Sequence, residues 1–428
     1  MISYHMNLTE DEEAMLRGDK GDTLRKIMET LVLYGETFGA ERMAPVTGAS
    51  HLVTSFGIPL LKPLFRIMDQ LVAGGLTAPR PFTADPRPLD YQNVPCSMME
   101  KIVFRIMYGK QREYEQQLLK IGMKENGFSC ACYLPEMGNC PQKGDILSWA
   151  ESSAVVYANS VIGARCNRNS GVLELFGTLA GRVPVFDLLT DEGRKAKWVI
   201  EVRTSGLPEA QILGSAIGLK VMEAVPYIKG LDTWLGRSLT DEVKAYLKDM
   251  GAATASNGAV GLYHVANLTP EATEHGEALI LPDAATYVID DAELKRVRES
   301  YPVMWPDPAA RPRLCFIGCP HLSYGQLLDW SEKILAALTK QNRQTVAVPT
   351  IMTAPPGVLA KFSRSELSNK LQAAGVRLTS ICPLMYMNNP IAAKKPVVTN
   401  SNKLRTYTTA RYDTDEQIIK IISGEAIQ

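Results

Sequence analysis

Two cysteines near the C-terminus occupy matching positions, each at the end of a short apolar run and directly before a proline. Cys319 ends the run in LCFIGCP, and Cys382 ends the run in VRLTSICP. Each run predicts a buried strand that opens into a loop, because proline cannot continue the ladder of a strand. Helical sequence joins the two strands, so they should lie parallel, with both thiols at the carboxyl edge of one sheet. Ligand sites of open α/β sheets lie at that edge, which makes both thiols candidate ligands of a cofactor.

A third thiol could come from the turn-rich segment FSCACYLPEMGNC, which carries Cys130, Cys132 and Cys140. Three thiolates can hold an iron–sulfur cluster while one iron stays free to bind substrate. A structural zinc site would more often show paired C-x-x-C knuckles, and this sequence has none. The alternative interpretation is that these cysteines are ordinary buried thiols, as free cysteines commonly are.

The stretch DILSWAESSAVVYANSVIGA predicts a mostly buried helix that ends at Gly163 and carries three polar side chains. Ser152 and Asn159 are seven residues apart, so they share one face, and Glu151 flanks that face. Such groups are costly to bury among apolar residues without partners. They are therefore candidates for proton transfer and substrate binding, or else they form a capped polar strip at a domain interface.

The glycine-bounded loop GARCNRNSG follows this helix and places Arg165, Asn167 and Arg168 close together. Two guanidinium groups near a helix end can hold a carboxylate or a phosphate bidentately, although arginines in loops are often only solvated. Further polar residues follow the strand-like segment KPVVT, at the same predicted sheet edge as the two C-terminal cysteines. They are Asn400, Ser401 and Lys403, which could bind a substrate or cap the next helix.

Two histidines lie in predicted loops beside small residues. His51 follows Ser50 in TGASH, and His321 lies two residues after Cys319. Imidazole changes its charge near neutral pH, so His321 could donate a proton to a departing hydroxyl or to a substrate. A structural role is the competing interpretation for a lone histidine.

The elements that would position these residues alternate between helices and strands. Thr9 and Glu12 form a capping box that starts the first helix. Residues 75–98 are rich in Gly, Pro and Asp, which predicts a long surface connection. The proline-rich stretch 301–312 predicts a boundary before a C-terminal parallel α/β unit.

Composition excludes several classes of protein. The 428 residues carry 46 basic and 46 acidic side chains, so no positive excess favours binding to nucleic acid. The N-terminus is acidic where a signal peptide would be basic, and no apolar run approaches the roughly 20 residues that span a bilayer. The sequence therefore predicts a soluble, cytoplasmic protein with reduced thiols, without nucleic acid or membrane partners.

Several sequence blocks together resemble the large subunit of the aconitase X family. They are SCACYLP, SWAESSAVVYANSVIGARCNRNSG, YHVANLTPEA, FIGCPHLS, ICPLM and VTNSNK, and they occur in the family's order. The resemblance implies an aconitase-like α/β fold, with several three-layer α/β domains around a central cleft. We expect an N-terminal domain over residues 1–145, a central domain over 146–310 and a C-terminal domain over 311–428.

The resemblance also implies an iron–sulfur cluster, of the 4Fe–4S or 2Fe–2S type, bound to Cys130, Cys319 and Cys382. Two positions depart from the family's pattern. Cys166 stands where the family's ART-N-R block has threonine, which affects a loop expected to touch the substrate. Cys132 stands where proline is common, so it stays an alternative ligand to Cys130.

The function that the resemblance implies is dehydration of a small hydroxy acid by a hydro-lyase. A separate small subunit is expected to carry the swivelling domain and a catalytic serine. The expected substrate is cis-3-hydroxy-L-proline, and mevalonate 5-phosphate is the alternative. Many Met, Gln, Asn and Cys residues argue against a hyperthermophilic source and favour the first substrate. The non-enzymatic alternatives are a zinc- or cluster-stabilised binding protein and an electron-transfer protein.

The polar residues named above receive expected roles on this basis, although their individual steps stay open. The expected catalytic residues are Glu151, Ser152, His51 and His321. The expected substrate-binding residues are Ser50, Asn159, Arg165, Asn167, Arg168, Asn400, Ser401 and Lys403.

Overall fold

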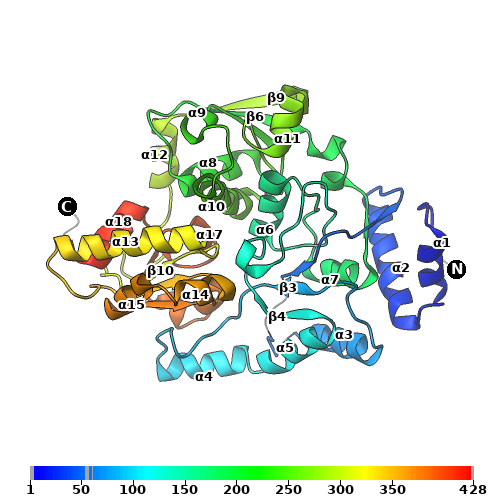
Figure 1. Ribbon diagram of the computed structural model, residues 1–428, viewed down its shortest axis with the longest axis horizontal. Coiled ribbons are helices and arrows are strands. Elements are labelled where there is room, and N and C mark those ends of the chain that lie inside the picture. The colour runs from blue at the N-terminus through cyan, green and yellow to red at the C-terminus, as the bar shows by residue number, and fades with distance from the viewer. Residues whose placement is uncertain (1–3, 54–56, 60, 426–428) are drawn as a thin grey trace.

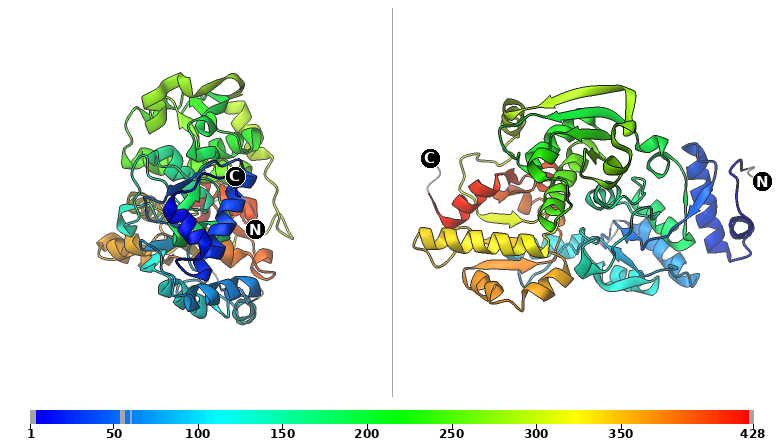
Figure 2. Two further views of the ribbon diagram at one scale, coloured as in Figure 1. Left: turned by 90° about the vertical axis from the view of Figure 1, so that its right-hand side faces the viewer. Right: turned by 45° about the horizontal axis from the view of Figure 1, so that its top comes forward.

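The computed structural model describes residues 4–53, 57–59 and 61–425. It contains three α/β units, each built on a parallel sheet of its own, arranged around the middle of the molecule (Figure 1). The helices nearest the N-terminus and the unit that ends at the C-terminus lie at opposite ends of the long axis (Figure 2). The predicted α/β fold, with parallel sheets in several domains, is confirmed. No helix in the described part of the chain is long and apolar enough to cross a membrane.

The first unit is built on the parallel sheet β2–β3–β4. Its elements are α1 (Glu10–Arg17), α2 (Asp22–Thr37), β1 (Met43–Pro45), β2 (His51–Leu52), α3 (Lys62–Ala73), β3 (Phe82–Ala84), α4 (Met98–Met107), α5 (Gln111–Lys120), β4 (Met123–Phe128), α6 (Ser152–Tyr157), a π-helical turn (Ala158–Ile162), α7 (Gly171–Ala180) and β5 (Arg182–Pro184). The predicted capping box is confirmed, since Thr9 and Glu12 each accept a hydrogen bond from the other's backbone amide. Because β5 pairs with β1 and α7 packs on α2, residues 171–184 lie with this unit, beyond the expected boundary at residue 145.

The second unit is built on the parallel sheet β8–β7–β6–β9. Its elements are β6 (Ala196–Val202), α8 (Ala210–Val221), β7 (Pro226–Lys229), α9 (Asp232–Leu235), α10 (Asp241–Gly258), β8 (His264–Val265), α11 (Pro270–His275), β9 (Ile280–Ile289) and α12 (Asp291–Glu299).

The third unit is built on the parallel sheet β12–β11–β10–β13–β14. Its elements are β10 (Leu314–Ile317), α13 (Tyr324–Lys340), β11 (Thr350–Thr353), α14 (Pro356–Phe362), α15 (Glu366–Ala373), β12 (Val376–Thr379), α16 (Pro383–Met387), β13 (Val397–Thr399), α17 (Asn402–Tyr407), β14 (Arg411–Tyr412) and α18 (Asp415–Ser423). Cys319 follows β10 and Cys382 follows β12, so the predicted placement of both thiols at one carboxyl edge is confirmed.

Contacts between helices hold the three units together. Helix α10 packs against α8 of its own unit, α6 of the first unit and α17 of the third. Alternate residues of β10 face two different cores: Cys315 and Ile317 pack with α13 and α18, whereas Leu314 and Phe316 pack with Phe104 of α4. Helix α4 of the first unit therefore covers one face of the third unit's sheet.

Two local predictions are wrong. Residues 75–98 are more than a surface connection, because they contain the buried strand β3. His51 lies on β2 and not in a loop. Both segments are rich in residues that favour turns, but their pairing with distant strands overrides that local preference, as tertiary context often does in sheets.

Candidate active site

The three expected ligand cysteines line one cavity of about 470 Å³. Cys130 lies two residues beyond β4, Cys319 lies two residues beyond β10, and Cys382 lies three residues beyond β12. The cavity thus lies between the carboxyl ends of strands from the first and third units. Parallel α/β sheets place their ligand sites at this position.

The other two cysteines of the first segment lie elsewhere. Cys132 is fully buried, and the exposed Cys140 donates its S–H to the Tyr133 carbonyl at 3.2 Å. The geometry therefore favours Cys130 over Cys132 as the third ligand. Among the residues that the structure describes, no group of three or more His, Cys, Asp or Glu is spaced to hold a single metal ion. The cysteines of a cluster bind different iron atoms, so their sulfurs stand further apart than the ligands of one ion.

Burial and nearby charges set the protonation of the three thiols. Burial raises the pKa of Cys130 and Cys319, and it raises the pKa of Cys382 to about 12. The Lys403 ammonium opposes this rise at each thiol. Such thiols are neutral at pH 7 and lose their protons when they bind a metal. Three thiols beside a buried ammonium group fit the ligand set of an iron–sulfur cluster.

Lys403 and Glu151 form a buried ion pair in the cavity wall. Glu151 is the N-cap of α6, and its Oε2 accepts hydrogen bonds from the Ser153 hydroxyl and the Ala154 amide, both at 2.6 Å. Lys403 also donates to the Ser152 hydroxyl at 3.4 Å. Burial favours the neutral form of Glu151, but Lys403 and these donors outweigh burial and lower its pKa below the usual value. The pair therefore stays ionised although it is buried.

Replacing Lys403 with methionine should lower the free energy of unfolding by about 3–5 kcal/mol, because it leaves the Glu151 carboxylate buried and unpaired. Chemical denaturation at pH 7 measures this change. The pKa of Glu151 is lowered in the folded state, so the stabilisation is present above the ordinary pKa of glutamate. It is lost as the pH falls through the lowered value, and the difference between wild type and variant should shrink accordingly.

The matched control is the double variant Lys403→Met/Glu151→Gln, which should recover most of the lost stability. Lys420→Met breaks only the exposed pair with Glu416 and should have little effect. An equal loss in the single and double variants would mean that packing of the lysine stem, and not its charge, causes the effect.

His321 lies in the cavity wall and joins the cysteine-bearing segments. Its backbone amide donates to the Cys130 sulfur at 3.4 Å, and its ring bonds the Ser129 hydroxyl at 3.1 Å and the Ile381 carbonyl at 3.0 Å. The carbonyl can only accept, so Nε2 carries the ring proton, and Ile381 directly precedes Cys382. Burial lowers the pKa of His321 to about 4, so the ring is neutral at pH 7. Both ring nitrogens of His321 are engaged by the protein. This geometry favours a positioning role for His321 over its expected role as a proton donor.

Asp85 also lines the cavity, although it was not among the expected site residues. It directly follows β3 and precedes Pro86, which is the same strand-end pattern as the Cys-Pro pairs and could have identified it. Its Oδ1 lies 3.4 Å from Nε2 of the fully buried His51, whose Nδ1 bonds the Thr83 hydroxyl at 2.9 Å. Neither Nε2 of His51 nor Oδ1 of Asp85 has a hydrogen-bond partner within the described ranges. Burial raises the pKa of Asp85 to about 6, so this carboxyl can exchange a proton near neutral pH.

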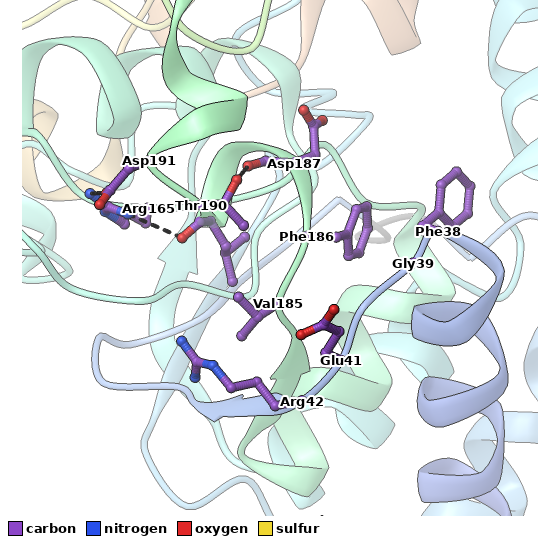
Figure 3. A pocket seen from close by; sticks show the side chains of 11 residues that line it. Phe38, Gly39, Glu41, Arg42, Arg165, Val185, Phe186, Asp187, Thr190 and Asp191 are labelled. Carbon is purple, nitrogen blue, oxygen red and sulfur yellow. Dashed lines mark hydrogen bonds and ion pairs between the residues drawn. The ribbon is translucent and has the colours of Figure 1, made fainter. Parts of the chain in front are cut away.

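Arg165 and Arg168 do not form the expected anion clamp at the thiol cavity. Arg165 pairs with Asp191 and donates to the Leu189 carbonyl at 3.1 Å, beside a separate cavity of about 540 Å³ (Figure 3). Arg168 is exposed and donates to the Ala259 carbonyl. Both guanidinium groups are directed by partners outside their own loop, which the local sequence does not reveal.

Asn159 and Asn167 are buried and hold the backbone after the π-helical turn. Asn159 donates to the carbonyls of Cys166 and Gly261 at 2.8 and 2.9 Å, and it accepts from the Cys166 amide at 2.9 Å. Asn167 donates to the Phe186 carbonyl at 3.1 Å. Backbone contacts account for Asn159, whereas Oδ1 of Asn167 has no hydrogen-bond partner among the described residues. Both residues lie outside the lining of the thiol cavity.

Three further residues expected to bind substrate are buried outside the lining of the cavity. Ser401 caps α17 and donates to the Cys319 carbonyl, so it holds one of the expected ligands in place. Asn400 donates to Asp415 at 2.9 Å. Ser50 is buried at the start of β2. Ser401 and Asn400 thus donate to other groups of the protein, and Oδ1 of Asn400 has no hydrogen-bond partner among the described residues.

Three α/β units with cysteines converging on one cavity place this protein in the class of aconitase-like dehydratases. The chain belongs to the aconitase X family: models of the family's first, second and third domains match residues 5–192, 196–299 and 312–421. The chain is therefore a hydro-lyase, and the resemblance found in its sequence is confirmed.

Similar proteins are known in archaea and bacteria. The chain is 30% identical to the phosphomevalonate dehydratase large subunit of Thermococcus kodakarensis, over 97% of this chain and 99% of that protein. It is 27% identical to the cis-3-hydroxy-L-proline dehydratase of Pseudomonas aeruginosa, over 92% of this chain but 65% of that protein. The crystal structure of Thermococcus kodakaraensis aconitase X in its holo form superposes with a TM-score of 0.79 at 29% identity, covering 97% of this chain and all of that chain.

Proposed function

We propose that this chain is the large subunit of an iron–sulfur-dependent dehydratase that acts on cis-3-hydroxy-L-proline together with a separate small subunit. The observation that carries the proposal is the convergence of Cys130, Cys319 and Cys382 on one cavity that also contains ionisable carboxyl groups. When bound, a cluster with one iron free of protein ligands supplies a Lewis acid for the departing hydroxyl. Two relatives that match along 99% and 86% of their length are named large subunits, which supports the separate small subunit.

The charges in the cavity support this substrate. Within the described lining, Asp85 and Glu151 are acidic and Lys403 is the one lysine or arginine. Such a wall suits a molecule with a cationic ring nitrogen and a carboxylate, which cis-3-hydroxy-L-proline has. Mevalonate 5-phosphate carries a carboxylate and a phosphate, and it would need more positive charge than Lys403 provides.

Mevalonate 5-phosphate is the second candidate because of the similarity to known enzymes. The chain spans 99% of the Thermococcus kodakarensis phosphomevalonate dehydratase large subunit, but only 65% of the Pseudomonas aeruginosa protein. The identities of 30% and 27% lie close together and do not separate the two substrates.

The residues of the cavity take different roles in this proposal. Asp85 accepts the proton next to the substrate carboxylate at its Oδ2, because its Oδ1 is buried and faces Nε2 of His51, which supports the change of charge from behind. Lys403 binds the substrate carboxylate through its ammonium group. Glu151 has its oxygens occupied by Lys403 and the helix N-terminus, so it holds the lysine in place. His321 keeps the cysteine segments together.

The proposal is tested with the complex of this chain and the small subunit of the same organism, reconstituted without oxygen. We expect loss of water from cis-3-hydroxy-L-proline, followed by NMR, with a kcat/KM at least about 100-fold above that for mevalonate 5-phosphate. The large subunit alone should have negligible activity. Faster turnover of mevalonate 5-phosphate would reverse the substrate assignment, and no turnover of either by a cluster-loaded complex would refute both.

A further inference from the structure

The outward face of α4 exposes large apolar side chains. Met98, Met99, Ile102 and Ile106 are 74%, 60%, 49% and 68% exposed. At 3.6 residues per turn they lie within one sector of the helix of about 100°. We call these four residues the α4 stripe. A contiguous exposed apolar surface of this kind is typical of a contact with another protein.

The charges on α4 define what its partner must present. Lys101 and Arg105 are exposed and flank the α4 stripe. Glu100 is the one acidic residue of the helix, and it is buried and paired with Lys395 on the opposite side. The face is therefore apolar with a positive edge, which fits an apolar partner surface with carboxylates at its rim.

The opposite side of α4 is attached to the wall of the thiol cavity. Phe104 packs in the same core as Tyr386 of α16. The Tyr108 hydroxyl, at the end of α4, donates to the carbonyl of Met385 at 3.0 Å, and Met385 lines the cavity. The Tyr386 hydroxyl donates to the Pro95 carbonyl at 2.8 Å. A body seated on the α4 stripe would therefore contact a helix whose opposite side packs on α16, and α16 forms part of the cavity wall.

We propose that the α4 stripe is the docking surface for the small subunit. This inference rests on the proposed two-subunit function. The chain has the length of relatives named large subunits, whereas it covers 65% of the Pseudomonas aeruginosa dehydratase. About a third of that longer protein therefore lies outside the part that this chain matches. In a two-chain enzyme, the small subunit needs a surface on an element that is attached to the cavity wall, and α4 provides both that attachment and the exposed apolar area.

The experiment compares binding of the purified small subunit of the same organism to two double variants, by sedimentation velocity of the cluster-loaded proteins. Ile102→Asp/Ile106→Asp should weaken association at least about 30-fold, which is the range of central contact residues. Leu119→Asp/Leu219→Asp changes two apolar residues of similar exposure on α5 and α8 and should bind like wild type. Iron content and thermal unfolding followed by circular dichroism should stay unchanged in both.

Four outcomes would overturn the proposal. One is unchanged small-subunit binding by the Ile102→Asp/Ile106→Asp variant, and another is equal weakening by the control variant. If the wild-type chain is a dimer and the Ile102→Asp/Ile106→Asp variant is a monomer, the α4 stripe binds a second copy of this chain. Flotation of the wild type, but not the variant, with phosphatidylglycerol vesicles would assign it to a membrane surface. A complex that forms through α4 yet dehydrates neither substrate would refute the proposed function and leave the docking surface standing.

Discussion

Cys130→Ser, Cys319→Ser and Cys382→Ser should each lose bound iron and lower kcat by at least about 10³-fold, because each thiol is expected to hold one iron of the cluster. The thiols lie at the ends of β4, β10 and β12, so no other described cysteine can replace one without moving a strand end. Anaerobic purification, an absorption spectrum and iron and sulfide assays measure cluster content, and turnover of the reconstituted complex measures kcat.

Cys132→Ser and Cys140→Ser are the matched controls, since both residues come from the same segment as Cys130 but lie outside the cavity lining. They should keep their iron and their activity. Loss of iron in Cys132→Ser but not in Cys130→Ser would mean that Cys132, and not Cys130, is the third ligand. A colourless protein with bound zinc would support a binding protein instead, and a fourth essential cysteine would support electron transfer.

Asp85→Asn should lower kcat by about 10³-fold, within the range for removal of a general base, while iron content and small-subunit binding stay unchanged. The amide has nearly the same shape as the carboxyl group but cannot accept the substrate's proton. Asp90→Asn is the control from the same connection, because Asp90 bonds Asn93 and Thr379 and does not line the cavity. Asp85→Glu should recover part of the activity. If Asp85→Asn keeps wild-type kcat, the base lies elsewhere, and the small subunit becomes its source.

The pH dependence gives a second test of Asp85. Its pKa is raised to about 6, mainly by burial, and the base form exists above that value. The kcat/KM of the wild type should therefore fall as the pH drops through about 6, and Asp85→Asn should lack this fall. The charged or titratable groups that act on Asp85 are His51, Glu151 and Lys403. Glu151→Gln should lower the pH at which kcat/KM is half-maximal, because Glu151 raises the pKa of Asp85. If Asp85→Asn keeps the wild-type fall at the same pH, that fall belongs to another group.

Local patterns were sufficient wherever the backbone and the nearest residues decide the structure. The capping box at Thr9 and Glu12 was predicted correctly because it involves four consecutive residues. The placement of Cys319 and Cys382 was correct because a short apolar run before proline predicts both the strand and its end, and parallel strands end at one edge. Arg165 and Arg168 lie outside the lining of the thiol cavity, because the direction of a long side chain depends on partners distant in the sequence.

The α/β class and the strand ends that carry the thiols follow from the amino-acid sequence, since apolar periodicity and proline act locally, and the resemblance of several sequence blocks indicates the family. The tertiary structure places Cys130 but not Cys132 in the cavity lining, brings Asp85 into that lining and engages both ring nitrogens of His321. It also decided that the Met98 side of α4 faces outward while Phe104 packs on the third unit's sheet. These outcomes depend on how the first and third units pack together, and burial at that contact sets which polar groups stay accessible and what their pKa values are.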